Sequence, residues 1–174
     1  MKKVIAVLLL IICTAVLFAA TTYTQTIVLM SVVEQTKPRF GLEIAYIENG
    51  YAVNSGNEVA IHSIDIRENT YVGINVCQSF SRFKGEVEIK ISVSELCCEK
   101  YHTEGLKLSV NSLDTGGRES RISIYENTCV LDLNYTGKAI TDSIVADILI
   151  EYNGNQNLPK KDYVSYVTMS YEAK

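Results

Sequence analysis

The stretch that decides the fold is Glu86-Val87-Glu88-Ile89-Lys90-Ile91-Ser92-Val93. Every second residue is apolar and β-branched, and the residues between them are charged or carry a hydroxyl. A period of two places the apolar side chains on one face of a β-strand and the polar ones on the other. The stretch therefore predicts an antiparallel strand with one face in the core and one face in water.

The same alternation recurs along the chain, and no long stretch has a helical period. Asn49-Gly50 predicts a hairpin turn, and a slip of phase at His62-Ser63 predicts a bulge. Thr115-Gly116-Gly117 and Asn153-Gly154-Asn155 predict loops. We expect about nine or ten strands in an all-β, two-sheet antiparallel β-sandwich, immunoglobulin-like or pilin-like. Alternating segments occur at residues 40–46, 106–110, 131–135, 144–152 and 163–171.

Composition and charge exclude some classes of function. Of the 174 residues, 47% are hydrophobic, too many for a disordered chain. The chain has 16 Lys and Arg against 20 Asp and Glu, a net charge of −4. Without the first 20 residues, which hold Lys2 and Lys3 and no acid, 14 basic residues remain against 20 acidic ones, a net charge of −6. An acidic surface repels phosphate, so we expect no nucleic-acid partner.

The N-terminus has the three-part layout of a secretory signal peptide. Met1-Lys2-Lys3 is basic, residues 4–18 form an apolar run, and Ala19-Ala20 supplies small residues. The run is shorter than the roughly 20 residues that a transmembrane helix needs, with a retained anchor as the alternative. Ile12 argues against lipidation at Cys13, because a small residue is expected before a lipidated cysteine.

These features predict the organisation and location of the chain. We expect a signal peptide over residues 1–20, cleaved near 19–22, and a single β-sandwich domain over 21–174. The mature chain is then secreted to the periplasm, the cell surface or the extracellular space, with no stable membrane insertion after cleavage.

Export would place the cysteines in an oxidising compartment. Signal cleavage removes Cys13 and leaves an even number, which favours disulfides: Cys77, Cys97, Cys98 and Cys129. Four cysteines allow three pairings, and a bridge between adjacent Cys97 and Cys98 would close a strained ring. We favour bridges from Cys77 and Cys129 to that pair, each contributing about 2–4 kcal/mol.

Two short patterns could carry chemistry. Cys97-Cys98-Glu99 with His102 is the densest group of potential zinc ligands, but adjacent side chains of an extended chain point to opposite faces. Asp114-Thr115-Gly116 matches the aspartic-protease tripeptide, which needs a second aspartate, and it is equally typical of a turn. The sequence holds no other catalytic motif. We expect no enzyme, no cofactor and no metal site.

The two ends of the mature chain resemble bacterial pilin-type sandwiches, namely alpha-type fimbrial major subunits and secreted pilin-like domains related to spore coat U. The matching features are an opening apolar segment over residues 26–33, Pro38, and a closing segment with Tyr163, Val167, Met169 and Tyr171. The resemblance implies assembly by strand donation, in which an N-terminal strand adds to the next subunit. The alternative is an ordinary edge strand of the chain's own sandwich. The candidate strand residues are Thr26, Ile27, Val28, Leu29, Met30, Val32 and Val33.

These patterns together predict contact rather than catalysis. We expect an exported structural or adhesive subunit of the cell surface, fimbrium-like, that self-assembles or binds a protein partner by strand addition. The alternative is a monomeric periplasmic or envelope-associated module that binds a ligand or a partner.

Overall fold

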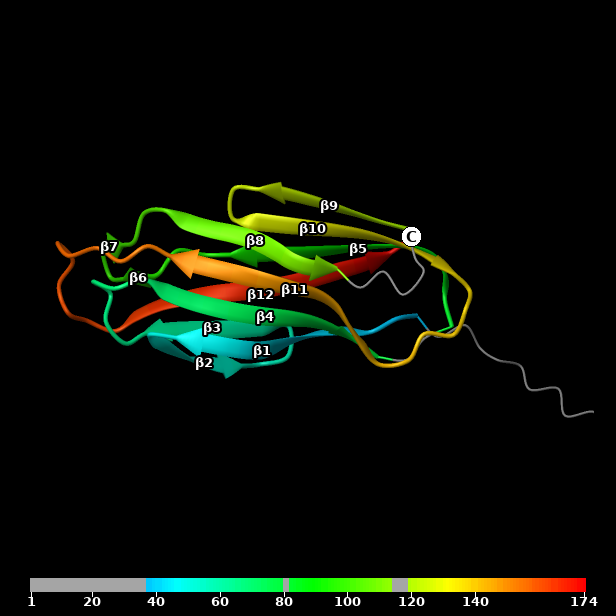
Figure 1. The fold of residues 1–174 in the computed structure, drawn as a ribbon, viewed down its shortest axis with the longest axis horizontal. Helices are drawn as coiled ribbons and strands as arrows, with labels where there is room; N and C mark the ends of the chain where they lie inside the picture. Colours follow the sequence, from blue (N-terminus) through cyan, green and yellow to red (C-terminus); the bar gives the residue numbers. More distant parts are fainter. Residues whose placement is uncertain (1–36, 80–81, 114–118) are drawn as a thin grey trace, which may run out of the picture. The chain divides into compact units, whose positions relative to one another are not determined.

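The computed structural model describes residues 37–79, 82–113 and 119–174. Within these ranges the chain is all-β and forms two antiparallel sheets, which confirms the predicted β-sandwich (Figure 1). The described residues include no helix that is long and apolar enough to cross a membrane. The four-stranded sheet has the order β1 (Phe40–Glu48), β4 (Thr70–Gln78), β11 (Ser143–Tyr152) and β8 (Leu106–Leu113).

The larger sheet is wider than its partner. Two short strands of two residues each, β6 and β7, lie off its main path, where β6 pairs with both β12 and β7. With them the described ranges contain twelve strands, more than the expected nine or ten. The main path has the order β2 (Gly50–Asn54), β3 (Glu58–Ser63), β12 (Tyr163–Ala173), β5 (Lys84–Val93), β10 (Thr128–Thr136) and β9 (Glu119–Tyr125), and the short strands are β6 (Cys97–Cys98) and β7 (Tyr101–His102).

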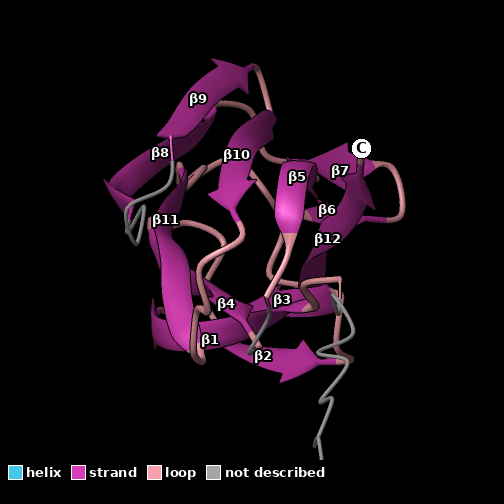
Figure 2. Cartoon of the chain, turned by 90° about the vertical axis from the view of Figure 1, so that its right-hand side faces the viewer, coloured by secondary structure: helices cyan, strands magenta, loops and turns pink. Residues whose placement is uncertain are grey.

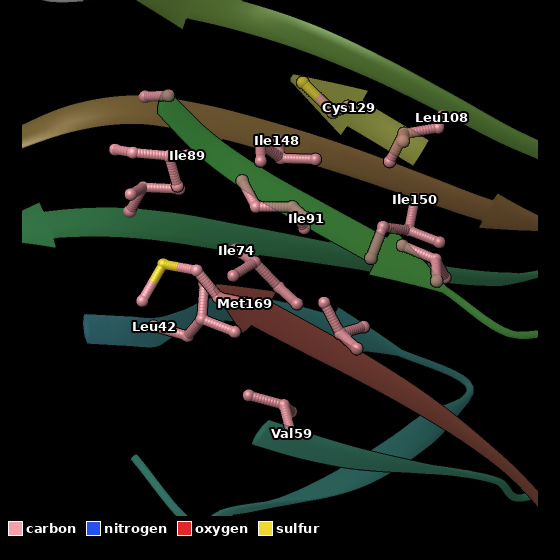
Figure 3. Packing of buried hydrophobic residues seen from close by; sticks show 14 of the residues in the cluster. Leu42, Val59, Ile74, Ile89, Ile91, Leu108, Cys129, Ile148, Ile150 and Met169 are labelled. Carbon is pink, nitrogen blue, oxygen red and sulfur yellow. The ribbon is translucent and has the colours of Figure 1, made fainter. Parts of the chain in front are cut away.

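The core lies between the two sheets and is built from the alternating residues. On β5 the four apolar residues of the deciding stretch are all buried, as predicted. Figure 3 shows Ile89 and Ile91 of this strand packed among Ile74 and Ile148 of the other sheet. Burying each such side chain contributes about 1.5–3 kcal/mol to folding, so this layer is the main source of stability.

Three strands, β1, β8 and β11, depart from the simple alternation because each contains one extra residue, and that of β8 lies between Val110 and Ser112. On β1 the register with β4 shifts between Ile44 and Tyr46, which leaves Tyr46 exposed. On β11 the register with β4 shifts between Ile144 and Ala146, which leaves Ile144 exposed. A bulge of this kind turns the following side chains to the opposite face.

The bulge that the sequence predicted at His62-Ser63 is not formed. The pairing of β3 with β12 runs without a register shift up to Ser63. The strand ends there, and Ile64 is exposed in the following loop while Ile66 returns to the core. The slip in phase therefore marks the end of a strand and not a bulge.

Asn49 occupies a corner between the sheets, so the predicted hairpin at Asn49-Gly50 is wrong. β1 belongs to the four-stranded sheet and β2 to the larger one. Asn49 has a φ of 56°, a left-handed conformation that asparagine tolerates better than most residues. Its Nδ2 donates to the Asp65 carbonyl at 2.8 Å, and its Oδ1 accepts from the Asp65 amide at 3.1 Å. These bonds fasten the corner to the loop after β3.

Two buried hydrogen bonds join the sheets. The Tyr152 hydroxyl on β11 lies 2.7 Å from the Ser165 hydroxyl on β12, and burial raises the pKa of Tyr152. The Tyr135 hydroxyl on β10 donates to Gln78 Oε1 on β4 at 2.5 Å. Since Tyr152 pairs with Thr70 at one end of β4 and Gln78 lies at the other, the two bonds hold opposite ends of the sandwich. Buried tyrosine hydroxyls need such partners.

Candidate functional site

The two long edges of the sandwich differ in how far other parts of the chain cover them. One edge is formed by β1 and β2, and the other by β8 and β9 (Figure 2). In the described part of the chain β8 pairs only with β11, and β9 pairs only with β10. An unpaired strand edge presents free backbone donors and acceptors to which another strand can add. The strands β1 and β2 on the other side also have one paired neighbour each, and the β8–β9 side is the candidate interaction site because of the apolar residues on its inner faces.

The inner face of β9 is apolar and exposed. Ile122 pairs with Leu131 of β10, and Ile124 pairs with Cys129. Side chains of directly paired residues project from the same face of a sheet, and Leu131 and Cys129 both point into the core with no exposed surface. Ile122 and Ile124 therefore face inward too, yet they are 38% and 42% exposed. The inner face of the larger sheet thus continues past the point where the narrower sheet covers it.

The inner face of β8 is also incompletely covered. Leu106, Val110 and Leu113 pair with inward-facing residues of β11 and are only half-buried. Leu108, between them, is buried. We call this surface the open edge, and it consists of Leu106, Val110, Leu113, Ile122 and Ile124.

The opposite edge is closed by its own chain. The turn between β2 and β3 folds back on β1, where the Leu42 amide donates to the Gly56 carbonyl at 3.3 Å. Asn54 Nδ2 donates to the Leu42 carbonyl at 2.6 Å, and the Asn49 corner links the two sheets directly. We call this the closed edge, because the turn after β2 supplies partners to both the amide and the carbonyl of Leu42.

A groove of about 470 Å³ crosses the outer face of the larger sheet. Glu86, Glu88, Arg121 and Asp132 are among its lining residues, and Lys174 Nζ lies 3.0 Å from Glu88 Oε2. The ion pair raises the pKa of Lys174. The lining residues include neither histidine nor cysteine, and the ionic groups partly neutralise one another. This groove therefore offers a charged surface on which acidic and basic groups lie together.

All four cysteines expected to form disulfides are free thiols in the structure. Cys77 lies near the end of β4, opposite Gly41, whereas Cys97 pairs with Val164 near the start of β12. Cys129 lies in the core of the larger sheet. The favoured bridges from Cys77 and Cys129 to Cys97 and Cys98 are therefore not formed.

The thiols differ in their surroundings. Cys77 Sγ donates to Glu43 Oε2 at 3.3 Å, and burial together with this carboxylate raises the pKa of Cys77 to about 11. Burial alone raises the pKa of Cys129 to about 11. Cys97 is exposed, and partial desolvation with nearby Glu95 raises its pKa. Raised pKa values keep these groups as thiols, which are weak nucleophiles.

The other candidates for chemistry do not come together. Cys97 pairs with His102 across the β6–β7 hairpin, but no group of three or more possible metal ligands occurs in the described ranges. His62 Nδ1 lies 3.2 Å from Asp162 Oδ1 and its ring stacks on Tyr51, away from any nucleophile motif. Asp114-Thr115-Gly116 lies outside the described residues.

Of the two segments that resemble pilins, the structure describes only the closing one. The opening segment, residues 26–33, lies outside the described residues. The closing segment forms β12, an interior strand between β3 and β5, and Tyr163, Val167 and Met169 are buried. No family model matches the sequence, and the searches found neither a similar curated protein nor a similar solved structure. The resemblance therefore stays a prediction.

Proposed function

We propose that this protein is an exported, non-catalytic subunit that acts by contact at the cell surface, as a structural or adhesive component of a pilin-like assembly. The observation that carries this proposal is the open edge. Ile122 and Ile124 expose apolar surface on the inward face of a strand that has no second neighbour in the described ranges. Proteins that stay monomeric protect such edges with charges, bulges or covering segments.

Strand addition is the contact that the open edge suits best. An added strand would satisfy the free backbone groups of β9 and cover Ile122 and Ile124 at the same time. The apolar segment over residues 26–33 is the part of the chain with the composition of such a strand. The signal peptide expected over residues 1–20 supports delivery to the periplasm, the cell surface or the extracellular space, where subunits of this kind assemble.

The test is the oligomeric state of the purified mature chain, residues 21–174. We expect multimers in size-exclusion chromatography with light scattering, and a ladder in SDS gels of unheated samples. If residues 21–35 act as a donated strand, deleting them should give a monomer with an unchanged far-ultraviolet circular dichroism spectrum, because the sandwich would not depend on them.

Two outcomes contradict the proposal. A sharp monomer peak of the intact mature chain would instead favour the alternative, a monomeric binding module of the periplasm or envelope. Unfolding or aggregation of the deleted chain would show that residues 21–35 are an internal part of the sandwich.

A further inference from the structure

We infer that Cys97 and His102 of two copies of the chain together bind one Zn²⁺ ion, so that a Cys₂His₂ site joins the copies through their β6–β7 hairpins. This inference goes beyond the proposed function, because the open edge contains neither residue. The hairpin lies at the end of the sandwich opposite the C-terminus (Figure 1). It is therefore a second, separate surface for contact between copies.

Backbone pairing holds the two ligands of one chain close together. Cys97 pairs directly with His102. The Thr103 amide donates to the Leu96 carbonyl at 3.0 Å, so these two flanking residues are a hydrogen-bonded pair. Hydrogen-bonded and non-hydrogen-bonded pairs alternate along an antiparallel ladder, which makes Cys97 and His102 a non-hydrogen-bonded pair. The Cβ atoms in such a pair are about 4.5–5.5 Å apart, at the short end of cross-strand distances.

Both ligands project away from the core. Leu96, next to Cys97, and Thr103, next to His102, are buried. Successive side chains of a strand point to opposite faces, and the cysteine and histidine ligands are accordingly exposed. Cys98 packs against the core from the other face. One thiol and one imidazole of each hairpin are therefore available to an ion from solvent.

The chemistry of this pair suits zinc. Zn²⁺ binds a thiolate at about 2.3 Å and an imidazole at about 2.0–2.1 Å, so the two donor atoms lie about 3.6 Å apart around a tetrahedral ion. Rotation about the Cα–Cβ bonds of the pair allows this separation. The Cys97 thiol donates to the Glu95 carbonyl at 3.4 Å, a weak bond that the Zn–S bond would replace. Each thiol releases its proton to solvent when the Zn–S bond forms.

The charges around the hairpin favour a bound dication. Partial desolvation and the Glu95 carboxylate raise the pKa of the Cys97 thiol, which shows that a negative charge lies near the ligand sulfur. Lys100 and Lys161 lie instead over the Tyr101 ring, with their Nζ atoms 5.4 and 5.5 Å from its centroid. Tyr101 precedes the histidine ligand and projects from the opposite face of β7, which is the face that the two ligands do not share.

A second copy completes the ligand set. The described ranges of one chain contain no group of three or more possible metal ligands, whereas structural zinc sites have four protein ligands in a tetrahedron. A twofold axis through the ion places the same two ligands of a second copy opposite the first pair. Two thiolates balance the charge of Zn²⁺, and tetrahedral coordination by two sulfurs and two nitrogens is typical of zinc.

The experiment titrates Zn²⁺ and Co²⁺ into the reduced, metal-free mature chain, residues 21–174. Equilibrium dialysis gives the number of zinc ions per chain, and the absorption spectrum of the cobalt form reports thiolate coordination and tetrahedral geometry. Sedimentation velocity in zinc and in EDTA measures association. We expect one Zn²⁺ ion for every two chains, together with an increase in sedimenting mass that EDTA reverses.

Substitutions identify the ligands. Cys97→Ser and His102→Gln should each weaken zinc binding more than about 100-fold, because one substitution removes two of the four ligands of the shared site. The matched controls are Cys98→Ser, in the same hairpin, and His62→Gln, at the other histidine of the chain. Both controls should bind zinc as the wild type does. Circular dichroism and urea midpoints verify that each variant is folded.

Three results would overturn the inference. Absence of zinc binding, or one ion per chain without a change in mass, would show that the hairpins do not build a shared site. An equal loss of affinity in either control would place the ion elsewhere. None of these results bears on the proposed function, because assembly at the open edge is measured in EDTA. A chain that is monomeric in EDTA and dimeric in zinc would contradict the proposed function and support the inference.

Discussion

The closed edge and the open edge of the sandwich both consist of strands with alternating apolar residues, but they differ in how far other parts of the chain cover them. At the closed edge, Asn54 and Gly56 hydrogen-bond to Leu42, and Asn49 turns the chain from one sheet to the other. At the open edge, Ile122 and Ile124 face inward and are only partly covered. In the described part of the chain, the turn after β2 packs on one side of the core, whereas the other side keeps exposed apolar surface.

The unequal width of the sheets accounts for the partial exposure of the inner face of β9 in the described part of the chain. The main path of the larger sheet has six strands and the opposing sheet has four. At the closed edge the extra width is taken up where β2 and its turn bend against β1. At the open edge the inner face of β9 is only partly covered by the described residues, with Ile122 and Ile124 still exposed. The location of the unsatisfied surface is therefore a consequence of strand order.

The largest expected difference in the effect of a substitution on the free energy of unfolding is between Leu131 and Ile122, which are paired on neighbouring strands. Leu131→Ala should lower the free energy of unfolding by about 2–5 kcal/mol, because it leaves a cavity in the core. Ile122→Ala in the deletion variant lacking residues 21–35 should cost less than about 1 kcal/mol, since its side chain is already partly in water. Urea denaturation followed by tyrosine fluorescence measures both. Equal losses would mean that the open edge is as well covered as the core.

Thiol labelling tests whether β10, the strand next to β9, is buried from solvent. Cys129 lies one strand further in and is fully buried, whereas Cys97 is exposed. Iodoacetamide at pH 8 should modify Cys97 more than about 100-fold faster than Cys129, because labelling of Cys129 requires opening of the core. Mass spectrometry of tryptic peptides gives the rates. Similar rates would show that β9 and β10 separate readily.

The same experiment measures a pH dependence. Only the thiolate reacts, and burial with the Glu43 carboxylate raises the pKa of Cys77 to about 11. Labelling of Cys77 should therefore still rise about tenfold for each pH unit from 8 to 10. A plateau below pH 9 would contradict the raised pKa. Failure of all four cysteines to react in unfolded, unreduced protein from its native compartment would instead show disulfides.

At the closed edge, Asn49→Ala should lower the free energy of unfolding by about 2 kcal/mol, because it removes two hydrogen bonds to Asp65 and places alanine in a left-handed conformation. Asn49→Gly is the matched control, since it removes the bonds but tolerates the φ of 56°. It should cost about 1 kcal/mol. Urea midpoints measure both variants. A cost below that of Ile122→Ala would contradict the closed-edge account.

The smallest expected effect on stability is that of Asp65, in the loop after β3 that hydrogen-bonds to Asn49. Hydrogen bonds from the Arg67 side chain and backbone lower the pKa of Asp65. The ionised carboxylate therefore stabilises the fold above its unfolded pKa of about 3.9, and this stabilisation is lost as the pH falls through the lower folded pKa. Asp65→Asn should slightly lower the urea midpoint at pH 7, and the two midpoints should converge below about pH 4. A constant difference down to pH 2 would contradict this.

The alternation of apolar and polar residues correctly predicted the buried face of strands that contain no bulge. The alternation at residues 86–93 predicted the buried face of β5, and the same logic held for Leu131, Leu133 and Tyr135 on β10. It did not predict the bulges of β1, β8 and β11, because one extra residue leaves no distinctive composition. Asn49-Gly50 signalled a sharp change of direction but not that the next strand joins the other sheet.

The open edge could not be predicted because it depends on strand order. Arg121-Ile122-Ser123-Ile124 has the same alternation as strands whose apolar residues are fully buried. Only the pairing of β9 with β10 alone shows that these isoleucines lie at an edge. Likewise the even number of cysteines predicted bridges, whereas the fold places Cys77 near the end of β4, opposite Gly41, and Cys97 opposite Val164 near the start of β12.

Hydrogen–deuterium exchange of the full mature chain, compared between dilute and concentrated samples, tests the central claim most directly. We predict that amides of residues 119–125 become protected as concentration rises, together with those of residues 26–33, while residues 40–54 at the closed edge exchange at an unchanged rate. Protection that appears at the closed edge, or no concentration dependence at residues 119–125, would contradict the assignment of β9 as the acceptor strand.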